Sequence, residues 1–185
     1  MRKEMGITTK ENSKKQIKKD EKKIINELLK NSNKSINEIA KTCGFSRQKV
    51  WRIIKGLEKN KTIWGYTAVI DEKKLEKKSY IILIKRTNQP VTKKMINAIT
   101  GRKMEEKAKG LGVKILSSVY TNGIYDYIIC FECNDIKDAK RFCESLSKEF
   151  TGFIKELHLL DKMFSVKKCG IENPNISGLE DLFDV

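Results

Sequence analysis

The first sixty residues carry apolar side chains at helical spacing. In residues 17–30 the apolar positions from Ile24 onward fall on one stripe, which is typical of an amphipathic helix. A second helix is predicted to begin at Ser35, because Ser35 and Glu38 have the spacing of a capping box. Its apolar positions also recur every three or four residues. The pattern therefore predicts two short helices in succession.

A tight turn and a third helix follow. Residues 43–45 read Cys-Gly-Phe, and Gly44 is free to adopt a positive φ. Ser46 is a suitable N-cap for a helix that runs to about Lys59. Two helices joined by such a turn predict a helix-turn-helix.

Beyond residue 61 the apolar pattern changes to that of strands alternating with helices. The Asn122-Gly123 pair is a strong signal for a hairpin. Strands are predicted at 62–70, 80–85, 113–120, 125–133 and 153–160, the last of which could continue over 163–166, and helices at 91–109, interrupted at Gly101, and 135–150. From residue 80 the order is βαββαβ. We therefore predict an α+β protein, in which an N-terminal helix-turn-helix domain is followed by a ferredoxin-like βαββαβ domain.

These elements predict how the chain is divided. The connector between the two domains is charged and polar around Leu75. The predicted segments are a basic flexible arm at 1–16, a helix-turn-helix domain with a trailing strand at 17–70, a linker at 71–79, a ferredoxin-like domain at 80–169 and an acidic tail at 170–185.

Both faces of the predicted sheet are apolar. Along the strand at 125–133, Ile129 and Phe131 alternate with Ile128 and Cys130. Two helices cover only one face of a four-stranded sheet, so the second face needs another cover. A partner subunit is the simplest candidate and predicts a homodimer. A general richness in Ile is the alternative explanation.

The net charge of +15 is concentrated at one end of the chain. Residues 1–61 hold 18 Lys and Arg against 7 Asp and Glu, a net +11, whereas residues 62–185 hold 21 against 17, a net +4. This asymmetry indicates a polyanionic partner, either nucleic acid or an anionic membrane surface. A composition biased toward Lys would raise the total charge but explains its concentration less well.

Other features bound the class of protein. No apolar run approaches the roughly 20 residues of a membrane span, and the start of the chain lacks the apolar core of a signal peptide. The 5 cysteines are scattered, which fits a reducing compartment. These features predict a cytoplasmic protein with no membrane partner.

The third helix carries residue types suited to reading DNA. Its first turn would enter the major groove, where Arg reads guanine and Gln reads adenine. Lysines of this helix and of the arm would neutralise phosphates. The predicted DNA-binding residues are Ser46, Arg47, Gln48, Lys49, Trp51, Arg52 and Lys55. The alternative is a helical hairpin with a solvated basic face. Double-stranded DNA is the predicted partner.

Residues 23–71 resemble the DNA-binding half of the leucine-responsive and asparagine regulators, the Lrp/AsnC family. In the second half, residues 121–126 are similar to the family's Gly-x-Tyr-Asp turn. The resemblance covers about residues 20–166 and implies a transcriptional regulator. It also implies dimers, higher homo-oligomers in many members, and an effector and oligomerisation role for the second domain.

The resemblance further implies a small amino-acid effector, bound in a crevice between dimers. Carried over by position, the effector-binding residues are Thr121, Asn122, Gly123, Tyr125 and Asp126. The alternative is that the Asn-Gly pair only makes a hairpin and that Asp126 only bonds to the turn. The longer segment at 86–112, Lys77-Lys78 in the connector and the tail from Gly170 depart from the family pattern.

A branch of similar proteins decarboxylates sirohaem, which gives an alternative enzymatic function. Its resemblance pattern has a histidine axial ligand where this chain has Ser118-Val119-Tyr120. Cys130 and Cys133 have a metal-like spacing, but no second pair follows, and His158 lies within a predicted strand. We therefore predict no catalytic residue, no metal and no cofactor.

Overall fold

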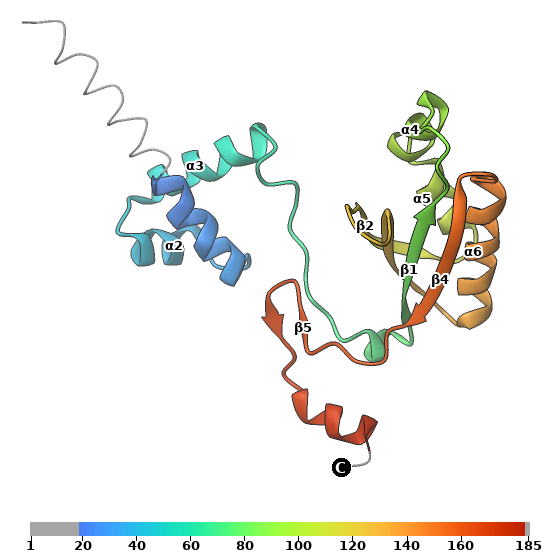
Figure 1. The fold of residues 1–185 in the computed structure, drawn as a ribbon. Helices are drawn as coiled ribbons and strands as arrows, with labels where there is room; N and C mark the ends of the chain where they lie inside the picture. Colours follow the sequence, from blue (N-terminus) through green and yellow to red (C-terminus); the bar gives the residue numbers. More distant parts are fainter. Residues whose placement is uncertain (1–18, 184–185) are drawn as a thin grey trace, which may run out of the picture. The chain divides into compact units, whose positions relative to one another are not determined.

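The computed structural model describes residues 19–183, apart from the side chains at 72, 73, 94 and 98. The chain forms two compact units (Figure 1). The first contains the chain up to Val69 together with Val166–Ser177, and the second contains Ile70–Ser165 together with the chain from Gly178. The predicted basic arm at 1–16 lies outside the described residues.

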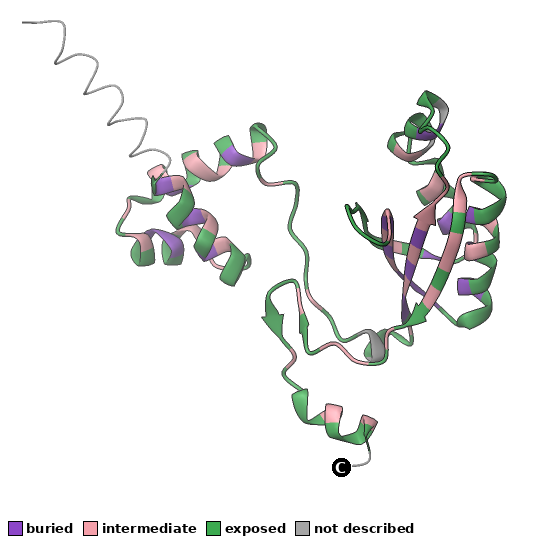
Figure 2. Ribbon diagram, in the orientation of Figure 1, coloured by how far each residue is buried: buried purple, intermediate pink, exposed green. Residues whose placement is uncertain are grey.

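Residues 19–59 of the first unit form three helices, as the apolar spacing predicted. A helix at 19–30 is followed by α2, Ile36–Cys43, and α3, Arg47–Lys59. Their apolar stripes meet in a small core, which Figure 2 shows as the buried positions on the facing sides of the helices. Its buried members are Ile24, Ile39, Ala40 and Val50.

The strand predicted at 62–70 is not formed. After α3 the chain turns, with Lys61 at φ 63°, and continues to residue 70 without joining a sheet. Trp64 is 94% exposed and Tyr66 is 51% exposed. The segment has the side chains of a strand, but a strand also needs a neighbour for its backbone N–H and C=O groups. No such neighbour exists in the described part of the chain.

The second unit is the predicted ferredoxin-like fold. Its sheet has the strand order β2-β3-β1-β4, and all neighbouring strands are antiparallel. The strands are β1, Lys78–Arg86, β2, Lys114–Tyr120, β3, Tyr127–Cys133, and β4, Ile154–Asp161, and the helices are α4, Lys93–Thr100, α5, Lys103–Gly110, and α6, Ile136–Glu149.

The structure differs from the predicted element boundaries in the linker at 71–79, but it has the predicted interruption of the helix at Gly101. β1 begins at Lys78, inside the predicted linker, and a 3-10 turn, η1, occupies Glu72–Leu75. The predicted helix at 91–109 is divided into α4 and α5 at Gly101, and Arg102 there has a φ of 58°. A non-glycine residue at positive φ strains the backbone, which marks this junction as a true break.

Helices α5 and α6 cover one side of the sheet. Buried Ile82 and Phe131 pack against Ala108 of α5 and Phe142 of α6. The opposite side is also apolar, as predicted. There Leu83 lies beside Ile128, and Ile81 lies beside Leu160, which is 44% exposed.

The hairpin between β2 and β3 is confirmed, but its loop is longer than the Asn-Gly pair suggested. The last paired residues are Tyr120 and Tyr127, and neither Asn122 nor Gly123 has a positive φ. A two-residue turn fails to form because Asp126 is directed to β1: its N–H donates to the Ile84 carbonyl at 2.8 Å.

The C-terminal segment has structure of its own. Residues 163–166, which could have extended the last strand, are not in a strand. They lead instead to a small hairpin, β5, Lys167–Lys168, and β6, Ile171–Glu172, and then to a 3-10 helix, η2, Ile176–Leu182. The hairpin turn places Cys169 at φ 50° and Gly170 at φ 82°.

Candidate nucleic-acid interface

The two helices of the helix-turn-helix are capped as the sequence predicted. Ser35 Oγ accepts the Glu38 N–H at 3.2 Å, and Glu38 Oε2 accepts the Ser35 N–H at 2.7 Å. Gly44 ends α2 with φ 70°. Ser46 then caps α3 by accepting the Lys49 N–H at 3.3 Å. These local bonds fix where α3 starts and therefore which of its side chains belong to its first turn.

One side of α3 is buried and the other is open to solvent. Val50 and Leu57 pack inward, whereas Trp51 is 53% exposed. The exposed side also carries Arg47, Gln48, Arg52 and Lys55. Of these, Arg47, Gln48 and Arg52 make no side-chain hydrogen bond or ion pair within residues 19–183. Their donors are free to bind base edges and phosphates.

Lys49, also predicted to bind DNA, is turned toward the protein. Its ammonium lies 2.6 Å from Asp20 Oδ2 and 4.2 Å from the centre of the Phe45 ring. Asp20 is only 3% exposed. The Lys49 side chain therefore joins the first helix to the start of α3. The sequence offered no signal for this partnership, since Asp20 lies on a different helix.

Lys55 is ion-paired on the helix surface. Its ammonium lies 2.7 Å from Glu58 Oε2, and the Tyr66 hydroxyl donates to Glu58 Oε1 at 3.1 Å. The Lys55 hydrogen bond holds the pKa of Glu58 below its ordinary value. Burial, and then this same bond to Glu58, raises the pKa of Tyr66. Any phosphate contact of Lys55 would compete with Glu58.

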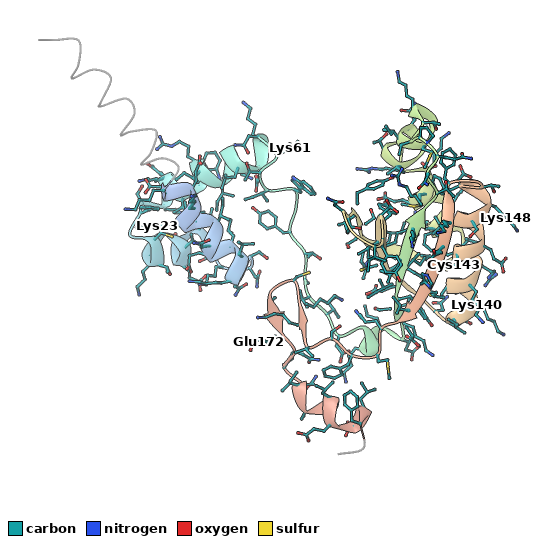
Figure 3. The ribbon with its side chains drawn as sticks, in the orientation of Figure 1. Lys23, Lys61, Lys140, Cys143, Lys148 and Glu172 are labelled. Atoms are coloured by element: carbon teal, nitrogen blue, oxygen red, sulfur yellow. The ribbon has the colours of Figure 1, made fainter. Side chains whose placement is uncertain are left out.

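A second cluster of charged groups braces the first helix. Glu27 accepts from Lys30 at 2.6 Å and from Lys34 at 2.7 Å. These hydrogen bonds, with that of Lys30 the larger, hold the pKa of Glu27 below its ordinary value. Lys34 lies just before α2, so this pair fixes the turn between the first two helices. Side chains of this unit, with Lys23 and Lys61 labelled, are shown in Figure 3.

The predicted effector residues are gathered in the loop between β2 and β3. The Thr121 N–H donates to the Asp126 carbonyl at 2.9 Å, and the Thr121 hydroxyl donates to the Tyr125 carbonyl. Tyr125 lies edge-on to His158 with ring centres 5.7 Å apart. Asn122 and Gly123 form the exposed tip.

The Asp126 carboxylate is engaged with Arg86. Oδ2 accepts the Arg86 backbone N–H at 2.8 Å, and Oδ1 accepts from Nε at 3.3 Å. The backbone bond is the main reason that the pKa of Asp126 lies below its ordinary value. A ligand ammonium at Asp126 would therefore share the carboxylate with Arg86.

Residues considered for metal or haem chemistry are dispersed. Cys133 is buried on the helical side of the sheet, whereas Cys130 lies beside Ile81 on the other side. His158 is exposed, 3.5 Å from Glu156. No group of three or more His, Cys, Asp or Glu suited to a metal ion occurs among the described residues. Within residues 19–183, no helix has both the length and the apolar character of a membrane span.

Comparison with known proteins bears on both units. Residues 21–63 match the family model described as winged helix-turn-helix DNA-binding. No curated protein matches the chain.

Several solved structures share the fold. An AsnC family transcriptional regulator from Agrobacterium tumefaciens is 19% identical with a TM-score of 0.59, covering 80% of this chain and 92% of that one. LrpC of B. subtilis is 18% identical with a TM-score of 0.55, covering 80% and 96%. A Neisseria meningitidis transcriptional regulator, solved as its L-Met complex, is 16% identical with a TM-score of 0.57, covering 81% and 92%.

The likeness extends over both units of the chain and nearly the whole of each solved regulator. The chain thus has the fold of the AsnC and Lrp regulators, with a helix-turn-helix of the winged DNA-binding type at its start, which is the family resemblance that its sequence indicated.

Proposed function

We propose that the protein is a sequence-specific DNA-binding transcriptional regulator of the Lrp/AsnC type. The observation that carries this proposal is the exposed side of α3. The helix is capped at its start, and its other side is buried. The exposed side presents Arg47, Gln48 and Arg52, and none of them has a side-chain partner within residues 19–183. Unpaired donors at the start of such a helix are suited to the base edges of the major groove.

Charge supports the same proposal. The net +11 of residues 1–61 attracts DNA without regard to sequence, and α3 would then discriminate among sites. The Lys49 ammonium takes no direct part in this proposal as long as it remains bound to Asp20.

The test is genome-wide binding of the tagged protein, with the operator motif extracted and then used in vitro. Arg47→Ala and Gln48→Ala should each weaken binding to the motif by roughly 1–3 kcal/mol and relax the preference for one base pair. Lys140→Ala, on the surface of α6 (Figure 3), is the matched control for loss of a positive charge and should leave motif preference unchanged. Uniform binding across the genome, with no motif, would refute the proposal.

We further propose that the protein is a homodimer joined through the open face of its sheet. Leu83, Ile128 and Leu160 lie on the side opposite the helices. An apolar face of this kind is normally covered, and a second copy of the chain presents the same face for an isologous contact. Higher homo-oligomers, as the family resemblance implies, would need further contacts.

A small amino-acid effector beside the loop at 121–126 is the third part of the proposal. The Neisseria regulator of the same fold was solved with L-Met, which supports an amino acid as the ligand class. The exposed loop tip could receive a carboxylate on its amides, and Asp126 could share its charge between Arg86 and a ligand ammonium.

A thermal-shift screen of the twenty amino acids tests this part. A real effector should stabilise the wild type by about 1–3 kcal/mol at concentrations well above its dissociation constant. Asp126→Asn should abolish the shift, whereas Asp181→Asn on η2 should retain it. No stabilising amino acid would refute an effector of this class.

A further inference from the structure

Lys23 lies next to the start of α3 although it belongs to a different helix (Figure 3). It is part of the first helix, at 19–30, and its ammonium lies 5.6 Å from the centre of the Phe45 ring. The Lys49 ammonium, in the first turn of α3, lies 4.2 Å from the centre of the same ring. Because both distances are measured to one ring centre, the two ammonium groups are at most about 10 Å apart.

The Phe45 ring positions the Lys23 side chain. An ammonium within about 6 Å of the centre of an aromatic ring is attracted to the negative face of that ring. Phe45 is itself held in place, because it packs against the core of the first unit and its N–H donates to the Ala40 carbonyl at 2.9 Å. It directly precedes Ser46, the N-cap of α3. The ring therefore keeps Lys23 beside the point at which α3 begins.

The two lysines that share this ring differ in what balances their charge. Lys49 is ion-paired with Asp20 at 2.6 Å, and that carboxylate is buried. Lys23 is exposed and makes neither an ion pair nor a hydrogen bond within residues 19–183. Of these two lysines, Lys23 is therefore the one whose charge an external anion can neutralise.

The distance of Lys23 from α3 matches the dimensions of DNA. The major groove is about 12 Å wide, and a row of phosphates follows each of its edges. A helix that enters the groove therefore has phosphates at about the distance that separates the Lys23 ammonium from the first turn of α3. A lysine ammonium is a compact charge on a flexible stem, and it binds phosphate without the exact geometry that a guanidinium requires.

We propose that Lys23 binds a backbone phosphate of DNA at the edge of the groove that α3 enters, and that Phe45 positions it for this contact. The contact that the sequence assigns to Lys49 is thus made by a lysine of another helix. A phosphate contact fixes the placement of the protein on DNA and carries no sequence information of its own. This inference rests on the proposed DNA-binding function and adds to it a residue outside the helix-turn-helix pair.

The experiment measures the affinity of the full-length protein for two duplexes over a range of salt concentrations. One duplex carries the operator motif obtained from genome-wide binding, and the other has an unrelated sequence. Each neutralised phosphate contributes about −0.9 to the slope of log K against log salt. Lys23→Gln should therefore make the slope shallower by about 0.9 and weaken binding to both duplexes by the same factor. Lys23→Arg, which keeps the charge, should retain the wild-type slope.

Lys22→Gln is the matched control for the loss of one positive charge. Lys22 precedes Lys23 on the same helix, is exposed, and has no ring contact within residues 19–183. Successive helical residues point about 100° apart, so Lys22 is directed away from Phe45 and its loss should change the slope much less.

Phe45→Leu tests the positioning role of the ring. It keeps an apolar side chain against the core but removes the ring, so Lys23→Gln should have a smaller effect on the slope when it is added to Phe45→Leu. Equal effects of Lys23→Gln in the two backgrounds would overturn the role given to Phe45. Should Phe45→Leu fail to fold, the comparison of Lys23→Gln with Lys22→Gln still decides whether Lys23 binds a phosphate.

Three results would overturn the inference. A slope for Lys23→Gln equal to that of the wild type or of Lys22→Gln would overturn it and leave the proposed function in place. A loss confined to the duplex with the motif would show that Lys23 reads bases, and it would overturn the phosphate contact. A wild-type protein that binds neither duplex would overturn the proposed function and this inference together.

Discussion

Arg47 and Lys49 both lie in the first turn of α3, but their side chains make different contacts. Arg47 is exposed without a partner in the described residues, whereas Lys49 is bound to the nearly buried Asp20. Sequence spacing alone gives them the same role, because both belong to the first turn of a basic helix. Only the contact between Lys49 and Asp20, which lies on another helix, distinguishes Lys49 from Arg47.

Lys49→Ala should therefore act on stability. Removing the ammonium leaves the Asp20 carboxylate buried with one partner fewer, at a cost of about 1–2 kcal/mol. Arg47→Ala should leave the free energy of unfolding unchanged, since its side chain is exposed. Urea unfolding of both variants measures the difference. Equal stabilities would show that the Lys49–Asp20 pair contributes nothing to folding.

Asp126 gives a pH dependence with a definite sign. The Arg86 backbone N–H lowers the pKa of Asp126 in the folded protein. Its stabilising contribution is thus complete above the unfolded carboxyl pKa of about 3.9 and is lost as the pH falls through the folded pKa. Asp126→Asn should be less stable than wild type at neutral pH, and the gap should close in acid. A gap that stays constant from neutral pH to acid would contradict the Arg86–Asp126 interaction.

At the scale of elements, local signals were sufficient for the helix-turn-helix. The capping box at Ser35, the positive φ at Gly44 and the cap at Ser46 all form as predicted. Each depends only on residues within a few positions of it. The strand predicted at 62–70 failed for the opposite reason, because β-forming side chains such as Trp64 do not supply the neighbouring strand. Likewise, the loop at 121–126 is shaped by Arg86 and Ile84, forty residues away.

Alanine substitutions at Gly44 and Gly56 of the helix-turn-helix should change the free energy of unfolding in opposite directions. Gly44 has a φ of 70°, and a residue with a Cβ in this left-handed conformation loses roughly 1–2 kcal/mol of stability. Gly56 is inside α3, and a Cβ there would meet nothing within 4 Å. Gly56→Ala should therefore stabilise by about 0.5–1 kcal/mol. Thermal unfolding of the two variants checks the signs. A stabilising Gly44→Ala would mean that this turn is not required as described.

At the scale of the whole molecule, the ferredoxin-like order and the two apolar sides of the sheet could both be predicted, since period-2 patterning specifies them. The partner that covers the open side of the sheet could not be predicted, because the sequence of one chain does not show where a second molecule binds. The sequence also did not predict a small cavity that lies between the sheet and its helices, near α4. Its lining comes from four strands and three helices, and no local pattern reveals such a convergence.

Leu83→Asp tests the proposed dimer. A carboxylate placed between Ile128 and His158 would have to be buried in the isologous contact, so the full-length variant should sediment as a monomer. Ile96→Asp, a charge placed at an exposed apolar residue on α4, should remain dimeric. A wild-type protein that is itself monomeric at micromolar concentration would refute the dimer.

The Lys49–Asp20 pair has a consequence for how the chain uses its first residues. Asp20 lies at the point where residues 1–18, with six Lys and Arg against two acids, join the described fold. Because Asp20 is ion-paired with Lys49 in the first turn of α3, the end of residues 1–18 stays close to that turn. In the proposed complex with DNA, the positive charges of residues 1–18 would lie near phosphates at an effective concentration that depends on the length of the connecting chain and not on the amount of protein. Residues 1–18 and α3 would thus behave as a bivalent ligand, in which engagement of one favours retention of the other.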